Sequence, residues 1–198
     1  MDLDERNLIL LFMINISAAI YANMSAVFLP LFIRSLEASV FEVSIVLFIG
    51  NAIATAMMLL GGYLSDRYGR KRTMMLCGFL WLITPILYIS ARSWPETIIY
   101  AAFSSAAMSF FNPTRAAMIM DIVRRSSAGK TYGLMNIAWP IGGILGPFIG
   151  GFIADQYGWT VFFYFLCLLA IIYLITVSYT HLRAHETSLH LVCRLLLE

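Results

Sequence analysis

The chain has 198 residues, of which 61% are hydrophobic and only 12% are charged, and its formal net charge is +2. Soluble domains carry about 25% charged residues, so this composition argues against a water-soluble protein, and the small net charge argues against nucleic-acid binding. Several uncharged runs exceed the roughly 18 residues that identify a transmembrane helix. The composition therefore predicts an all-α membrane protein with several transmembrane helices.

Charged residues divide the sequence into six apolar stretches, each near the roughly 20 residues that a helix needs to cross a bilayer. The predicted transmembrane helices comprise residues 8–33, 43–64, 73–91, 97–119, 131–154 and 159–177. We interpret residues 1–177 as one six-helix unit.

The loops between the predicted helices differ sharply in positive charge. The side that includes the N-terminus carries Arg6, Arg67, Arg70, Lys71, Arg72, Arg124, Arg125 and Lys130. The loops on the other side carry only Arg34 and Arg92. Because short loops rich in Lys and Arg stay in the cytoplasm, we expect a multi-pass protein of the cell membrane with both ends of the six-helix unit in the cytoplasm.

Polar side chains interrupt the first two predicted helices. They are Asn15, Tyr21, Asn23 and Asn51. A polar group within a membrane span either faces a water-filled cavity or forms hydrogen bonds to neighbouring helices. The sequence leaves both interpretations open: a substrate cavity, or hydrogen bonds that hold the helices together.

The segment between the second and third predicted helices, residues 61–72, reads Gly-Gly-Tyr-Leu-Ser-Asp-Arg-Tyr-Gly-Arg-Lys-Arg. Gly69 permits a tight reversal there, because glycine adopts a positive φ angle without steric cost. The segment resembles the loop between helices two and three of the major facilitator superfamily, whose pattern is roughly G-x-L-[SA]-D-R-x-G-R-[KR]. The resemblance implies a transporter made of two six-helix halves, of which this chain matches the N-terminal half.

In that superfamily, the loop carboxylate, the arginine four residues later and an acidic residue at the foot of helix four form a charge network that clasps the two halves together. Asp66, Arg70 and Asp121 occupy these positions here. We therefore assign a conformational gate to Gly62, Asp66, Arg67, Gly69, Arg70, Asp121 and Arg115. The alternative is an ordinary interfacial ion pair, which contributes at most about 1 kcal/mol when exposed.

Arg115 follows Asn112 and Pro113 inside the fourth predicted helix. A cation inside a span is costly and therefore suggests a function. Helix rise puts Arg115 only about 10 Å from the cytoplasmic end of the helix. We expect its side chain either to extend to the membrane surface or to join the network of Asp66, and we favour these roles over substrate contact.

An internal repeat relates the second and fifth predicted helices. Residues 61–69 and residues 150–158 share the pattern Gly-Gly-x-x-x-Asp-x-Tyr-Gly. Because the two copies lie three predicted spans apart, they should face opposite sides of the membrane. The repeat therefore predicts two inverted three-helix units, an arrangement that is typical of transporters.

The fifth predicted helix contains a glycine-rich motif with one proline. Its residues are Gly142, Gly146, Pro147, Gly150 and Gly151. The motif resembles g-x-x-x-G-P-x-x-G-G, which is typical of the drug-efflux antiporters of the superfamily, and this resemblance implies export. Close helix packing alone is the alternative, since small residues let two backbones approach.

The sixth predicted helix is bulky, with a run from Phe162 to Leu166, and is expected to face lipid. The chain departs from the efflux pattern in two ways. The arginine that drug antiporters carry before the proline of helix four is absent, and no span has an acidic residue at mid-membrane to carry a proton.

We predict alternating-access transport of a small solute, with export favoured, by the N-terminal half of a twelve-helix protein. The expected partners are the solute, a coupling proton, the lipid bilayer and the missing C-terminal half. A six-helix homodimeric transporter and an integral-membrane enzyme are the alternatives, although no cluster of His, Asp, Ser or Cys converges within the spans. We expect no cofactor, no metal and no nucleic acid.

The last stretch, residues 178–198, differs from the rest of the chain. It contains every histidine, together with Cys193. His181, His185, His190 and Cys193 resemble a metal site in composition. We interpret this stretch instead as a non-native tail that resembles a sequencing-adapter read-through, with an amphipathic helix as the alternative.

Overall fold

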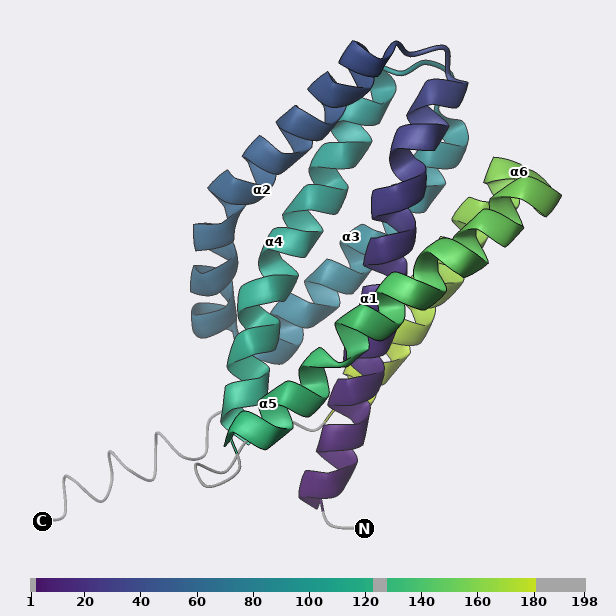
Figure 1. The fold of residues 1–198 in the computed structure, drawn as a ribbon. Helices are drawn as coiled ribbons and strands as arrows, with labels where there is room; N and C mark the ends of the chain where they lie inside the picture. Colours follow the sequence, from purple (N-terminus) through teal and green to yellow (C-terminus); the bar gives the residue numbers. More distant parts are fainter. Residues whose placement is uncertain (1–2, 123–127, 181–198) are drawn as a thin grey trace, which may run out of the picture.

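The computed structural model describes residues 3–122 and 128–180, and within these ranges the side chains of residues 3–7, 121, 122, 128, 130 and 131 are outside the description. Figure 1 shows a bundle of helices, and the described residues contain no strand. The elements are α1 (Leu3–Ser35), α2 (Val40–Tyr68), α3 (Arg70–Ser90), α4 (Glu96–Ile122), α5 (Ala128–Asn136) and α6 (Ala138–Tyr179).

Within the described residues, four helical stretches are long and apolar enough to cross a membrane. They are Leu8–Ser35, Val40–Tyr68, Arg70–Ser90 and Tyr132–Tyr179. The last of them has 48 residues, which would make roughly 70 Å of straight helix against about 30 Å of hydrocarbon core. A single crossing by this stretch is therefore excluded.

The chain reverses its direction within α6. Gly158 has φ 79° and ψ 177°, which separates α6 into two helical segments, residues 138–157 and 159–179. In Figure 1, α6 crosses α1 obliquely and then returns in the opposite direction. Only glycine adopts this backbone conformation without strain, so the position of the turn is encoded in the sequence.

A second interruption lies at the junction of α5 and α6. The predicted fifth helix, 131–154, is not continuous, because α5 ends at Asn136 and α6 begins at Ala138. Pro140 explains the break. It has no N–H to donate to the Asn136 carbonyl four residues earlier, and its ring crowds that carbonyl.

The segment that carries the motif of residues 61–72 is helical for most of its length. The predicted second helix ends at residue 64, but α2 continues to Tyr68, and α3 begins at Arg70. Gly69, with φ 90°, ends one helix and starts the next. Asp66 and Arg67 therefore lie in the last turn of α2 rather than in a loop.

The returning part of α6 corrects the expectation of a lipid-facing sixth helix. Phe162, Phe163 and Leu166 are almost completely buried, whereas Tyr164 and Leu168 are exposed. The buried rings join an aromatic cluster with α1 and α3, in which the Phe163 ring lies 4.8 Å from that of Phe32. One face of this segment therefore belongs to the core of the bundle.

Candidate functional site

Two charged residues of the predicted gate, Asp66 and Arg67, lie at the end of α2. Both are exposed. Arg67 donates a hydrogen bond to the Tyr63 hydroxyl, and its guanidinium carbon lies 5.6 Å from the ring of Tyr63 and 5.8 Å from that of Tyr68. Arginine stacks favourably on aromatic faces, so these contacts hold the Arg67 side chain along the helix.

Arg70 is half-buried at the first position of α3. The side chain of Asp121, the third member of the predicted network, lies outside the described residues. The structure thus brings Asp66 and Arg70 to one helix junction, at Gly69, and the closure of the network through Asp121 stays a prediction.

Lys71 makes a contact that the sequence did not reveal. Its Nζ donates hydrogen bonds to the backbone carbonyls of Ser178, at 2.6 Å, and Thr180, at 2.9 Å. Cations at helix C-termini satisfy free carbonyls and interact favourably with the helix dipole. Lys71 therefore caps α6 from the start of α3. Its partners lie more than a hundred residues away, and no local pattern could have predicted them.

The two glycines near the end of α2 have different surroundings. A Cβ at Gly61 would lie 2.6 Å from the carbonyl oxygen of Ser109 and 2.9 Å from the Cα of Phe110, whereas a Cβ at Gly62 would meet nothing within 4 Å. Pro113 is four residues after Ser109 and has no N–H for that carbonyl. The α2 backbone thus packs directly on the turn of α4 in which Pro113 removes a backbone hydrogen bond.

Arg115 lies in the interior of the bundle and is 8% exposed. Its Nε donates to the Asn15 side-chain oxygen on α1, and its NH2 group donates to the Asn136 side-chain oxygen at 2.6 Å. The guanidinium carbon lies 5.6 Å from the centre of the Trp139 ring. One side chain of α4 therefore joins α1, the end of α5 and the start of α6. We refer to these residues as the Arg115 cluster.

The structure corrects one expected role of Arg115 and leaves the other as a prediction. The side chain is buried rather than extended to the membrane surface. Its hydrogen bonds among the described side chains go to amide oxygens and not to Asp66, and an approach to Asp121 of the same network stays a prediction. The reason is that the break after Asn136 brings an acceptor and an indole ring within reach. Asn15 and Arg115 were both singled out in the sequence, but their pairing across 100 residues was not.

The other predicted cavity residues do not meet at one place. Tyr21 is buried and donates to the backbone carbonyl of Trp81 at 2.9 Å. That carbonyl is free because Pro85, four residues later, has no N–H. Asn23 and Asn51 each donate to a carbonyl of their own helix, and Asn51 is exposed. For Tyr21, interhelical hydrogen bonding is the interpretation that the geometry supports.

Three members of the glycine motif line the crossing of α6 over α1. A Cβ at Gly142 would lie 2.6 Å from the Ala19 carbonyl carbon, and one at Gly150 would lie 2.8 Å from the Phe28 ring. At Gly146 the nearest backbone atoms would be 3.1 Å away. At Gly142 the close atoms include the α1 backbone, so a side chain there would force the two helices apart, whereas at Gly146 and Gly150 the neighbouring atoms of α1 would have to shift.

The remaining members of the glycine motif, Pro147 and Gly151, are half-buried. Gly143, next to the motif, is exposed, and a Cβ added there would meet only the Asn23 side chain, at 3.7 Å. A Cβ at Gly151 would lie 3.4 Å from the Phe28 ring, so this glycine also borders α1, whereas Gly143 lies on an exposed face of α6.

Comparison with known proteins identifies the family of the chain. The model of the Major Facilitator Superfamily matches residues 11–190. An uncharacterised MFS-type transporter of Methanocaldococcus jannaschii is 27% identical over 169 residues, which are 85% of this chain and 44% of the relative. The multi-drug resistance efflux pump PmrA of Streptococcus pneumoniae is 27% identical over 137 residues, with coverage of 66% and 34%.

Solved structures share the fold. A peptide transporter in complex with sulfate has a TM-score of 0.80 at 16% sequence identity, covering 88% of this chain and 37% of that one. A D-xylose-proton symporter has a TM-score of 0.69 at 15% identity, covering 98% and 51%. The chain thus spans less than half the length of the curated relatives described above.

Proposed function

Because the chain belongs to the major facilitator superfamily, we propose that it moves a small solute across a membrane by alternating access, as the N-terminal six-helix half of a twelve-helix transporter. The observation that carries this proposal is the match to the family over residues 11–190. The chain corresponds to 44% of the length of the archaeal relative, which fits one half of such a protein. The family is one of transporters, so the chain is an integral membrane protein and not an enzyme.

Six spans arranged as two inverted repeats are part of the proposal. Gly69 and Gly158 occupy the same position in the two copies of the sequence repeat, and both have a positive φ angle, 90° and 79°. The glycines that begin the two copies, Gly61 and Gly150, both lie in close helix crossings. The first contacts α4 and the second contacts Phe28 of α1. These paired features are what a two-fold relation between the repeats would produce.

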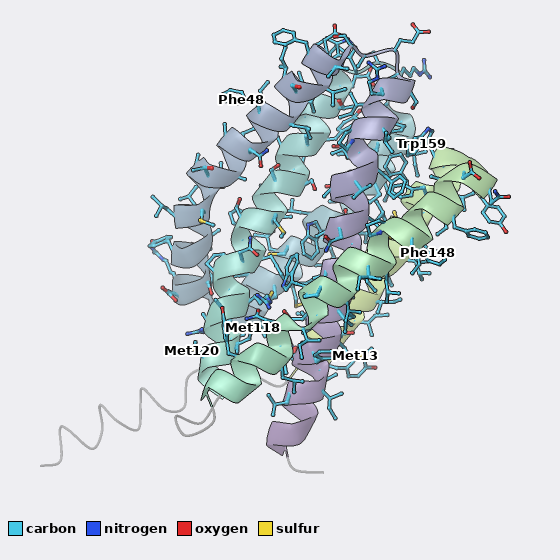
Figure 2. All side chains as sticks on the ribbon, viewed as in Figure 1. Met13, Phe48, Met118, Met120, Phe148 and Trp159 are labelled. Atoms are coloured by element: carbon cyan, nitrogen blue, oxygen red, sulfur yellow. The ribbon has the colours of Figure 1, made fainter. Side chains whose placement is uncertain are left out.

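A second half would cover a surface that this chain leaves open. The outer face of α2 carries small or polar exposed side chains, among them Asn51, Ala52, Thr55 and Ala56, and Gly62 has open space beside it. Helix interfaces in membranes are rich in small residues. Phe48 of α2 and Phe148 of α6, which are 74% and 77% exposed, extend from the outside of the bundle (Figure 2).

The gate is proposed at the junction of α2 and α3, with Gly62, Asp66, Arg67, Gly69 and Arg70, and with Asp121 as the partner from α4. Asp66 is exposed at a helix end, so its loss should disturb folding little. An alternating transporter has two states separated by a few kcal/mol, and removing one clasp shifts their populations strongly.

The gate is tested in the twelve-helix protein that the proposal requires. Asp66→Asn should reduce transport strongly at unchanged expression. The matched control is Asp155→Asn, at the equivalent position of the second repeat copy, which is exposed and hydrogen-bonded only to Gln156 among the described residues. Equal damage from both changes would contradict the gate and favour a packing role for the motif.

The direction and coupling of transport are also proposed. The relative from Streptococcus pneumoniae is a multi-drug resistance efflux pump, and the glycine motif of α6 resembles that of efflux antiporters, so we favour export. A coupling proton, if one is used, would be carried by the second half, since the spans of this chain lack a mid-membrane acid.

Flux measurements decide between the half-transporter and a homodimer. The 198-residue chain is reconstituted in liposomes and tested with a panel of cationic dyes, sugars and organic anions. We expect no saturable flux, because rocking of one bundle needs a second bundle to move against. Saturable flux from this chain alone would overturn the half-transporter proposal and favour a six-helix homodimer.

The orientation in the cell membrane is proposed from the loop cations and is tested by cysteine labelling. Tyr68→Cys and Arg92→Cys replace exposed residues at opposite ends of the bundle. A membrane-impermeant maleimide added to intact cells should label position 92 and not position 68, because the cation-rich end stays in the cytoplasm. Labelling at position 68 from outside would reverse the topology.

A further inference from the structure

The Arg115 cluster contains a positive charge that nothing in the described part of the chain neutralises. Arg115 is 8% exposed, and its side-chain hydrogen bonds go to the neutral amides of Asn15 and Asn136. No carboxylate within the described residues forms an ion pair with it. An arginine is effectively always protonated, and a charge within a span is costly unless it is matched. Among the described residues, the charge of Arg115 is therefore met only by neutral amide oxygens and an aromatic ring.

The geometry leaves donors for a ligand. A guanidinium has five N–H donors in a fixed planar fork, and the two hydrogen bonds to Asn15 and Asn136 use only two of them. The amides and the Trp139 ring, 5.6 Å away, hold the plane of the guanidinium in one orientation. A preorganised fork of this kind matches the two oxygens of a carboxylate or a phosphate.

The cluster lies near a surface of the bundle. Asn136 and Trp139 are half-buried, and their neighbours Ile137 and Pro140 are exposed. The residues come from α1, α4 and the broken junction of α5 and α6. Irregular backbone at membrane depth is tolerated where it lines a cavity or is buried in protein, and interrupted helices border the substrate sites of many transporters.

We infer that Arg115 binds an oxyanion, and that the transported solute carries a carboxylate or phosphate group which this arginine recognises. Asn15, Asn136 and Trp139 position the guanidinium and do not supply charge. The claim that the bound solute is transported rests on the proposed function, whereas the anion-binding site itself is formed by residues of this chain. An organic cation would be repelled at this position, because the field of Arg115 is not offset by a nearby acid among the described residues.

Direct binding tests the inference on the 198-residue chain in nanodiscs of phosphatidylcholine, a lipid without net charge. Radiolabelled benzoate and inorganic phosphate serve as probes, and tetraphenylphosphonium serves as the cationic comparison, in equilibrium dialysis. We expect saturable binding of at least one anion. Arg115→Gln should weaken it roughly tenfold to a hundredfold, the range for losing a hydrogen bond to a charged group.

Two further variants keep the result interpretable. Arg115→Lys retains the charge but loses the planar fork, so it should fold like the wild type and bind the anion more weakly. Arg92→Gln removes an exposed arginine at the other end of the bundle and should bind as the wild type does. Circular dichroism confirms that each variant is helical, and if Arg115→Gln fails to fold, the lysine variant decides.

The inference is overturned if the folded wild-type chain shows no saturable anion binding, or if both Arg115 variants bind like the wild type. Nanodiscs that contain phosphatidylglycerol distinguish a lipid headgroup from a solute. If the anionic lipid abolishes binding of the probes through Arg115, the occupant is lipid and the solute assignment fails. A chain that binds anions while the twelve-helix protein shows no flux would refute the transport proposal and leave the site intact.

Discussion

The crossing of α6 over α1 gives a sharp test of the structure, because two adjacent glycines there have opposite surroundings. In Gly142→Ala, the new methyl group would lie 2.6 Å from the carbonyl carbon and the Cβ of Ala19. In Gly143→Ala, the nearest atom would be a side-chain oxygen of Asn23 at 3.7 Å, an ordinary contact. The two variants have the same chemistry and differ only in the face of the helix that they alter.

The expected magnitude follows from two opposing effects. Alanine in place of glycine within a helix stabilises by about 0.5–1 kcal/mol. At position 142 the neighbouring backbone of α1 must move away, and such overpacking costs about 1–3 kcal/mol. We therefore expect Gly142→Ala to be destabilising by about 1–2 kcal/mol, and Gly143→Ala to be neutral or slightly stabilising.

Thermal unfolding in detergent, followed by circular dichroism at the helix band, measures both changes. For a chain of this size, 1 kcal/mol corresponds to about 2–4 °C in the midpoint, so Gly142→Ala should lower the midpoint by about 2–8 °C. Gly143→Ala should leave it unchanged or raise it slightly. If the two variants unfold at the same temperature, α6 does not pack on α1 through Gly142, and the helix crossing described above is wrong.

Other contacts give further predictions with the same assay. Gly61→Ala should destabilise the chain and Gly62→Ala should not, because only the first methyl group meets the backbone of α4; equal midpoints would contradict the α2–α4 crossing. Tyr21→Phe should cost about 1 kcal/mol, since it leaves the Trp81 carbonyl without its donor, and an unchanged midpoint would show that another donor replaces it. Lys71→Met should expose amide protons in the last turn of α6 to faster hydrogen exchange, and unchanged protection there would rule out the cap.

Much of the fold could be predicted from single residues whose backbone chemistry acts locally. Gly69 and Gly158 end helices because only glycine tolerates their φ angles of 90° and 79°. Pro140 breaks the fifth predicted helix by removing one donor, whereas the hydrophobic continuity of residues 131–154 predicts an unbroken helix. The glycine spacing of the fifth helix predicted a close crossing, and the structure identifies α1 as the partner.

The contacts of the candidate site were much less predictable. Arg115, Asn15 and Tyr21 were all singled out as polar groups within spans, but nothing in the sequence indicates that the first two meet across 100 residues or that the third satisfies a carbonyl on α3. Each of these pairs is a long-range contact. Local spacing specifies which residues need a partner, whereas only the packing of the helices specifies which partner each one obtains.

The membrane environment accounts for this division. The apolar composition determined the protein class. The positions of charged residues and helix-terminating glycines determined the approximate ends of the helices, because these residues mark where a chain enters and leaves the apolar phase. Inside the bilayer, lipid is as apolar as a packed side chain, and hydrophobicity no longer distinguishes the buried face of a helix from the exposed one. Phe163 and Tyr164 are adjacent, aromatic and expected to face lipid alike, yet the first is 2% exposed and the second 60%. Only the tertiary structure decided between them, because the difference lies in which helix each ring meets.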